Sequence, residues 1–188
     1  LVSIAEFLPI PSLLSFKKLN PKSQQIVNTA LELMCKRFGQ TISRYQSLEP
    51  QRKNLSLIHF AERGYITDVY LILKSGADIN AVDIYGYTAL IFASRNCRYD
   101  FVEMLIEYGG INVNAATRDG DTALIEASKN GHASIVHKLL MVDGIDVSAA
   151  NGSGNTALIE ASQNGHSDIV QKLLMVDVID VNVTNRDY

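Results

Sequence analysis

The apolar and polar positions of the chain repeat at a fixed interval. Residues 121–147 read DTALIEASKNGHASIVHKLLMVDGIDV, and residues 155–181 read NTALIEASQNGHSDIVQKLLMVDVIDV, 34 residues later. Weaker copies of the same pattern occupy residues 87–113 and 55–79. A fixed period of this length indicates a repeat architecture, in which each unit is one small supersecondary structure.

Each copy predicts two short helices. A threonine two positions after a glycine can cap the first helix by accepting a backbone hydrogen bond, as at Thr122. Asn130-Gly131 predicts its end, because glycine tolerates a left-handed turn; Cys97 takes the glycine place in the second copy. The second helix carries apolar residues at helical spacing: Ile135, Val136, Leu139 and Leu140. Two such helices cannot bury their apolar faces alone, so the copies must stack and share a core.

The repeat unit resembles the ankyrin repeat. Residues 122–128 (TALIEAS) stand where that family has T-P-L-H-x-A-A, and residues 131–140 (GHASIVHKLL) keep its G-H-x-x-I-V-x-x-L-L run. Alanine replaces the family's proline and isoleucine replaces its histidine. The resemblance implies an all-α ankyrin-repeat solenoid, built of helix-turn-helix repeats with β-turn or hairpin loops. It covers about four repeats over residues 51–188, and the chain is expected to be a fragment that enters a further repeat at its end.

The first 38 residues do not follow the repeat pattern, and they resemble the later part of an F-box. The order Phe7-Leu8-Pro9, Leu13-Leu14-Ser15-Phe16, Leu19-Asn20 and Ile26-Val27 carries the resemblance, although the family's tryptophan is absent. The resemblance implies docking on the adaptor subunit of an SCF-type ubiquitin ligase through Leu8, Pro9, Leu13, Leu14, Phe16 and Leu19. The alternative is a three-helix cap on the first repeat, whose apolar face needs cover. A linker helix is expected within residues 39–50.

Charge and cysteine content narrow the possible functions. Residues 1–54 hold eight Lys/Arg and three Asp/Glu, a balance of +5, whereas the remainder holds nine and seventeen, a balance of −8. An acidic surface repels phosphate, so a nucleic-acid partner is not expected. No apolar run approaches the ~18 residues that predict a membrane span. The two cysteines, Cys35 and Cys97, form no disulfide framework and fit a reducing compartment such as the cytoplasm.

Candidate catalytic residues have simpler explanations in the repeat. His132 and His166 occupy equivalent helix-start positions and are expected to be structural, and His137 is expected on the surface. Glu126 and Glu160 are also equivalent, so the repeat explains this carboxylate pair better than a glycosidase site does. No metal-ligand or phosphate-binding motif occurs. We therefore expect no enzyme activity, no cofactor and no metal in this chain.

Stacked repeats usually bind proteins through their concave surface. The ankyrin resemblance places that surface on the turn tips and on exposed positions of each first helix. The expected partner-binding residues are Ile84, Tyr85, Tyr87, Phe92, Arg95, Arg118, Asp119, Asp121, Glu126, Lys129 and Glu160. Tyr85, Tyr87, Phe92 and Arg95 are interpreted as anchors, since aromatic and arginine residues dominate binding hot spots. The alternative is that these rings pack on neighbouring loops.

The sequence thus favours an adaptor that recruits a protein substrate to an SCF-type ubiquitin ligase. F-box and ankyrin segments joined in this way resemble effectors of intracellular bacteria and proteins of large viruses, which would act in the host cytoplasm or nucleus. Two alternatives remain: a plain ankyrin scaffold or inhibitor with an N-terminal helical cap, and the binding part of an enzyme whose catalytic domain lies outside this fragment.

Overall fold

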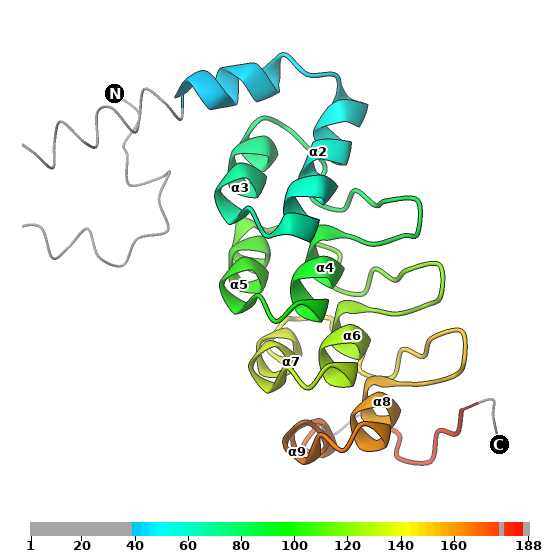
Figure 1. Cartoon of the computed structure of the whole chain (residues 1–188). Helices are drawn as coiled ribbons and strands as arrows, with labels where there is room; N and C mark the ends of the chain where they lie inside the picture. The colour runs from blue at the N-terminus through cyan, green and yellow to red at the C-terminus, as the bar shows by residue number, and fades with distance from the viewer. Residues whose placement is uncertain (1–38, 177–178, 186–188) are drawn as a thin grey trace, which may run out of the picture.

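The computed structural model describes residues 39–176 and 179–185, and within them the chain is a stack of four helical hairpins (Figure 1). The inner helices are α2 (Pro50–Arg63), α4 (Ala89–Arg95), α6 (Ala123–Lys129) and α8 (Ala157–Gln163). The outer helices are α3 (Ile66–Lys74), α5 (Tyr99–Tyr108), α7 (Ala133–Leu140) and α9 (Ser167–Leu174). Inner helices pack on inner helices, and α5, α7 and α9 pack in the same order. The predicted all-α solenoid is confirmed.

The helix boundaries follow the local chemistry of the repeat. The hydroxyl oxygens of Thr88, Thr122 and Thr156 accept hydrogen bonds from backbone N–H groups three residues on, at 3.2, 3.2 and 3.3 Å. These bonds satisfy donors that the first helical turn leaves free. The predicted threonine caps are therefore confirmed. Ala116 pairs with Thr122, and Ala150 with Thr156, in isolated antiparallel bridges that close the loops before α6 and α8.

Cys97 holds the left-handed backbone conformation that glycine takes in the other repeats. Its φ is +57°, whereas the equivalent Gly131 has +76°. A residue with a Cβ is strained there by about 1–2 kcal/mol. Glycine removes that strain, but it lowers the free energy of unfolding by about 0.5–1 kcal/mol because its unfolded state has more conformational freedom.

Replacing Cys97 with glycine is therefore expected to raise the free energy of unfolding by about 0.5–1 kcal/mol. The side chain is exposed, so its removal loses little packing. Urea unfolding would measure the gain. Cys97→Ala keeps the Cβ and should show no gain; an equal gain from alanine would contradict the strain argument.

The core is one continuous apolar layer between the inner and outer helices. Equivalent leucines of the third and fourth repeats, Leu139 and Leu173, are both fully buried. Ile135 and its equivalent Ile169 are also buried, with at most 1 % of their surface exposed. The apolar positions read from the sequence thus face the shared core, where each buried aliphatic side chain contributes about 1.5–3 kcal/mol.

Asparagine side chains join one repeat to the next. Asn114 donates its amide to the Gly144 carbonyl (2.7 Å) and accepts from the Asp146 N–H (2.8 Å). Asn80 makes the same pair of bonds to Gly110 and Asn112. Asn80 and Asn114 are 34 residues apart and therefore occupy equivalent positions of the repeat.

A second inter-repeat contact uses the residue before each outer helix. The Nε2 of His132 donates to the Arg95 carbonyl (3.0 Å), and that of His166 to the Lys129 carbonyl (3.1 Å). Arg98 bonds the Glu62 carbonyl in the same way (3.4 Å). The structural role predicted for the two histidines is confirmed, and Arg98 is a third member that the sequence reading missed.

Residues 39–46 form a helix that covers the open end of the first repeat. The ring of Tyr45 lies 5.9 Å from that of Phe60, and its hydroxyl donates to Asp68 on α3 (3.0 Å). Burial and this hydrogen bond raise the pKa of Tyr45 to about 12, so the hydroxyl remains a donor at neutral pH. The F-box residues predicted from the sequence, Leu8, Pro9, Leu13, Leu14, Phe16 and Leu19, lie outside the described residues.

Candidate protein-binding surface

Three projecting loops stack beside the inner helices and form a row of turn tips (Figure 1). The Arg118 N–H donates to the Tyr85 carbonyl (2.8 Å), and the Gly152 N–H donates to the Asp119 carbonyl (2.6 Å). Inside each tip, one side chain holds the turn: Asp83 accepts from the N–H groups of Tyr85 and Tyr87, both at 2.8 Å. Asn151 does the same in the third loop. Hydrogen bonds within and between the loops thus fix the backbone from which the side chains at the tips project.

The predicted aromatic anchors divide into two groups. Tyr87 and Phe92 are half-buried and stack on each other, with ring centroids 4.9 Å apart and an interplanar angle of 29°. Arg95 donates to the Tyr87 hydroxyl at 2.9 Å and lies over the same ring. Tyr85 instead stands at the tip with 62 % of its surface exposed, beside Ile84 at 69 %. The exposed apolar contact area is therefore on Ile84 and Tyr85, and the other two rings pack partly against the protein.

The sequence reading placed Glu126 and Glu160 on the exposed face of the inner helices, and this is wrong. They are only 4 % and 5 % exposed, because the loops fold over that part of each helix. Glu126 accepts hydrogen bonds from Asn130 (3.2 Å) and from the Tyr87 hydroxyl (3.5 Å). Glu160 accepts from Asn155 at 2.9 Å. Both carboxylates therefore hold loops and helices together.

The environment of Glu126 disfavours its charge. Burial raises the pKa of its carboxyl group, Asp121 raises it further, and Arg95, Lys129 and Asn130 act in the opposite direction. Burial, followed by the Glu126 charge, also raises the pKa of Tyr87, which keeps that hydroxyl protonated as a donor. The Arg95–Tyr87–Glu126 chain of hydrogen bonds thus ends on a buried carboxylate.

Glu126→Gln is expected to make the protein more stable at about pH 7 and to leave it nearly unchanged at about pH 4. The carboxyl pKa is higher in the folded than in the unfolded chain, so its favourable contribution is complete below 4.5 and is lost as pH rises through the folded value. Glutamine remains neutral and still offers an acceptor. Urea unfolding of both proteins across this range measures the difference; a variant less stable at pH 7 than at pH 4, relative to wild type, would contradict the raised pKa.

Five of the predicted partner-binding residues line one hollow of about 480 Å³ between the second and third turn tips and helices α6 and α8. They are Arg118, Asp119, Asp121, Lys129 and Glu160. Asn151 lies among them and was missed by the sequence reading. Its amide donates to Asp121 at 2.8 Å. Its position, equivalent to that of the turn-forming Asp83, is the signal that could have found it. The lining is polar, which suits a hydrogen-bonding partner better than an apolar ligand.

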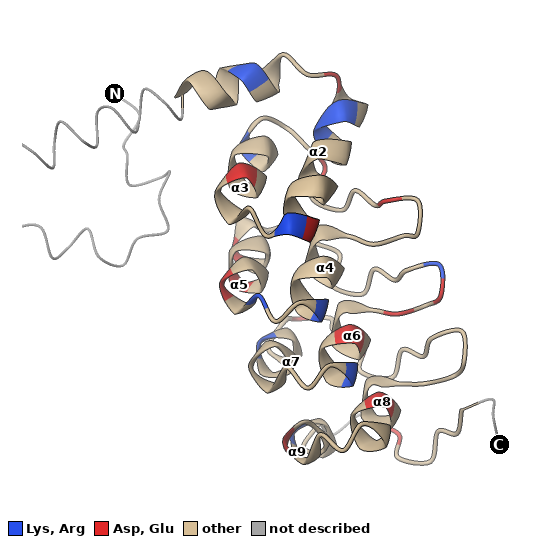
Figure 2. Cartoon of the chain, in the orientation of Figure 1, with Lys and Arg blue, Asp and Glu red and all other residues tan. Residues whose placement is uncertain are grey.

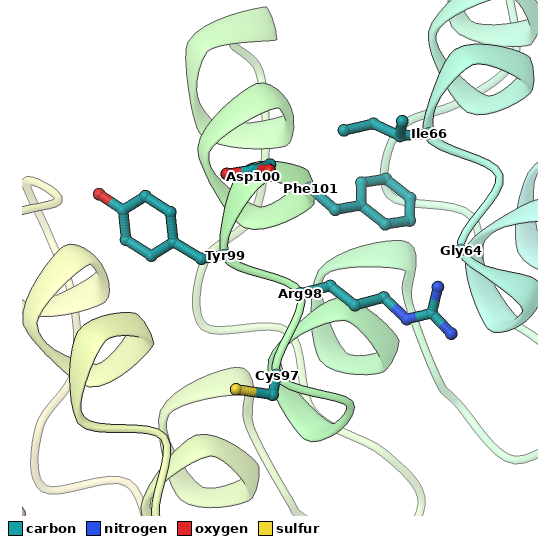
Figure 3. A pocket seen from close by; sticks show the side chains of 7 residues that line it. All are labelled: Gly64, Ile66, Cys97, Arg98, Tyr99, Asp100 and Phe101. Carbon is teal, nitrogen blue, oxygen red and sulfur yellow. The ribbon is translucent and has the colours of Figure 1, made fainter.

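A second hollow, of about 380 Å³, lies between the first two repeats (Figure 3). It is lined by Gly64, Ile66, Cys97, Arg98, Tyr99, Asp100 and Phe101. Arg98 extends toward Gly64, and its guanidinium occupies the place that a Cβ on Gly64 would take. The left-handed backbone of Gly64 (φ +76°) and the packing of Arg98 against it both favour glycine at this position.

Among the described residues, no group of histidine, cysteine and carboxylate side chains could hold a metal ion. Over the same residues, no helix has both the length and the apolar character that a bilayer crossing requires.

Comparison with known families agrees with this geometry. A model of ankyrin repeats in many copies matches residues 57–106, and a model of ankyrin repeats in three copies matches residues 110–185. Together the two matches cover more than half of the chain, which therefore belongs to the ankyrin-repeat proteins. Repeats of this family are protein-interaction modules that typically carry no catalytic site. No curated protein matches the chain.

Proposed function

We propose that this chain is a non-catalytic adaptor that holds a protein partner on its turn tips and inner helices. The observation that carries the proposal is the contrast between the third and fourth repeats. The residue types buried within 121–147 recur in 155–181, whereas the positions that differ are exposed or half-buried in the third repeat. Lys129 stands against Gln163 at the inner-helix end, and Arg118-Asp119 stands against Gly152-Ser153 at the tip. A constant core beneath a variable surface supports recognition by that surface.

Ile84 and Tyr85 are the strongest candidates for anchors. They are large, apolar and exposed on a loop that hydrogen bonds hold in place. Such residues dominate binding energy when a partner buries them. Phe92 is less suitable for a test, because it packs against the core and against Tyr87, so its removal would also disturb folding.

The combined replacement Ile84→Ala and Tyr85→Ala tests the binding surface. A photo-crosslinker at the neighbouring Val82 would first identify the natural partner, whose affinity is then measured by calorimetry. The double variant should bind at least about tenfold more weakly, with an unchanged unfolding midpoint. Met141→Ala, at an exposed position after the outer helix α7, is the matched control and should bind normally. Equal affinities of the double variant and wild type would overturn the assignment of the surface.

The proposed adaptor role extends to a ubiquitin ligase. Residues 1–38 would dock on the adaptor subunit of an SCF-type complex in the cytoplasm, and the repeats would hold the substrate beside the ligase. Holding two proteins together acts by raising their effective concentration. This step rests on the residue order around Leu13 and Leu14. The full chain should co-purify with the ligase adaptor, and Leu13→Ala with Leu14→Ala should abolish that complex; no complex with the unaltered chain would reject the ligase role.

A plain ankyrin scaffold is the alternative, and one observation favours it. The helix at residues 39–46 packs on the first repeat through Tyr45, as a terminal cap would. Neither family match extends into residues 1–38. Partner binding without ligase-adaptor binding is the outcome that selects this alternative.

A further inference from the structure

The tips of the three projecting loops share one turn geometry. Each tip is a turn of four residues that ends in a glycine, at 83–86, 117–120 and 151–154, with 34 positions between equivalent residues. In each turn the glycine N–H donates to the carbonyl of the first residue, at 3.1, 2.9 and 2.8 Å. The three glycines have φ values of +86°, +84° and +82°. The turns are therefore equivalent, and their contacts can be compared position by position.

Each turn is joined to the preceding one through its backbone. The N–H of the second residue donates to the third-residue carbonyl of the turn before it: Arg118 to Tyr85, and Gly152 to Asp119. The preceding glycine lies against the same N–H, since a Cβ on Gly86 would be only 2.9 Å from the Arg118 nitrogen. One hydrogen bond and one glycine thus define each contact of the loop stack.

The first loop has the donor of this contact but no turn to receive it. Ile84 is equivalent to Arg118, and among residues 39–176 and 179–185 its N–H has no acceptor. The cause is the length of α2, which has fourteen residues where α4 has seven, because its extra residues take the place of a preceding loop. Figure 1 shows α2 continuing past the first loop, with no further described loop at that end of the row.

The side chains around this free donor are exposed and apolar. Ile84, Tyr85 and Val82 have 69, 62 and 53 % of their surface exposed. The first loop carries no Lys or Arg, whereas the second carries charges of both signs (Figure 2). An open edge of unpaired backbone groups is a template for pairing with another chain, and burial of the flanking apolar surface would stabilise the contact.

We propose that a β-turn of the protein partner docks on the Asp83–Ile84 edge and continues the loop stack. The third residue of that turn offers its carbonyl to the Ile84 N–H, and its fourth residue is a glycine with positive φ. The glycine is required because the Asp83–Ile84 backbone would approach it as closely as the next turn approaches Gly86. This inference rests on the proposed protein-binding function and specifies how the partner is recognised, which is by addition to an open backbone edge.

Two variants at position 84 isolate the hydrogen bond. Ile84→Pro removes the N–H and Ile84→Ala keeps it, and both lose the isoleucine side chain. Ile84 is the second residue of its turn, where the fixed φ of proline is favoured, so the turn should persist. Both variants should therefore unfold at the same midpoint. Arg118→Pro is the matched control, because it removes an N–H that the stack already uses and should lower the midpoint.

The probe is a backbone-cyclised peptide that contains residues 114–122 of this chain and so presents the turn ending in Asp119-Gly120. The control peptide has valine in place of that glycine. In amide NMR spectra of the full chain, the glycine peptide should shift the Ile84 signal and slow its hydrogen exchange, and the valine peptide should do neither. Followed at the Tyr85 amide, the glycine peptide should bind Ile84→Pro about three- to tenfold more weakly than Ile84→Ala.

Equal binding to the proline and alanine variants, equal binding of the two peptides, or no shift with either peptide would overturn the inference. So would an Ile84 amide that is as protected in the free chain as the Arg118 amide, because another part of the chain or a second copy would then already occupy the edge. If the inference fails in any of these ways while the Ile84/Tyr85 double variant still loses the natural partner, the proposed function stands.

Discussion

Replacing Gly120 with alanine is expected to destabilise the protein by about 2–4 kcal/mol and to disrupt the second turn tip. Gly120 has φ +84°, and a Cβ on it would lie 2.9 Å from the Asn151 Cα and 3.1 Å from the Gly152 nitrogen. Both neighbours are backbone atoms of the next loop, so neither can rotate away. Relief requires the loops to separate, which breaks the Gly152–Asp119 hydrogen bond.

Gly144→Ala separates the conformational cost of a Cβ at positive φ from the steric cost of its clash with the next loop. Gly144 has φ +79°, close to that of Gly120, but a Cβ there would meet no atom within 4 Å. Its cost is therefore the conformational one, about 1–2 kcal/mol. Urea unfolding of both variants gives the difference. If the two substitutions lower the free energy of unfolding equally, the turn tips do not stack in solution. The hollow lined by Arg118 and Lys129, which lies between two of these tips, would then not form either.

The sequence predicts the parts of this fold that depend on local chemistry and periodicity. Thr122 caps its helix, Cys97 takes a left-handed glycine place, and Leu139 and Leu173 are buried because each follows from spacing within one repeat. The fixed period of the repeat then predicts that the units stack side by side. Residues equivalent in position must perform equivalent contacts, which is why His132 and His166 could be assigned a structural role.

Contacts made across the repeat boundary are predicted less well. Glu126 occupies a helix position that periodicity leaves outside the core, and only the loop that folds over it explains its burial. Phe92 takes the equivalent place in the preceding repeat, where it stacks on Tyr87. Arg98 and Gly64 fit each other as His166 and Gly131 do, but an arginine replaces the histidine of the later repeats. Such pairs depend on side-chain shape in three dimensions, which a pattern of apolar positions along the sequence does not specify.

The same leucine is expected to contribute unequally in two repeats of nearly the same sequence. Leu124 on α6 is 1 % exposed, because α8 covers it, whereas the equivalent Leu158 on α8 is only half-buried. Removing a fully buried leucine side chain costs about 2–5 kcal/mol, and a partly exposed one leaves a smaller cavity and loses less burial. Leu124→Ala should therefore cost about 3 kcal/mol and Leu158→Ala about half as much.

Hydrogen exchange measured together with urea unfolding would locate each loss. In a solenoid, stability is close to a sum of repeat terms and nearest-neighbour interfaces, so Leu124→Ala should weaken protection in both α6 and α8. Leu158→Ala should weaken protection in α8 and α9 and leave α4 nearly unaffected. Equal costs at the two sites would mean that something covers α8 as fully as α8 covers α6. Since both leucines stand in the same Thr-Ala-Leu-Ile-Glu-Ala-Ser sequence, any difference between them comes from the neighbouring repeat and not from the local sequence.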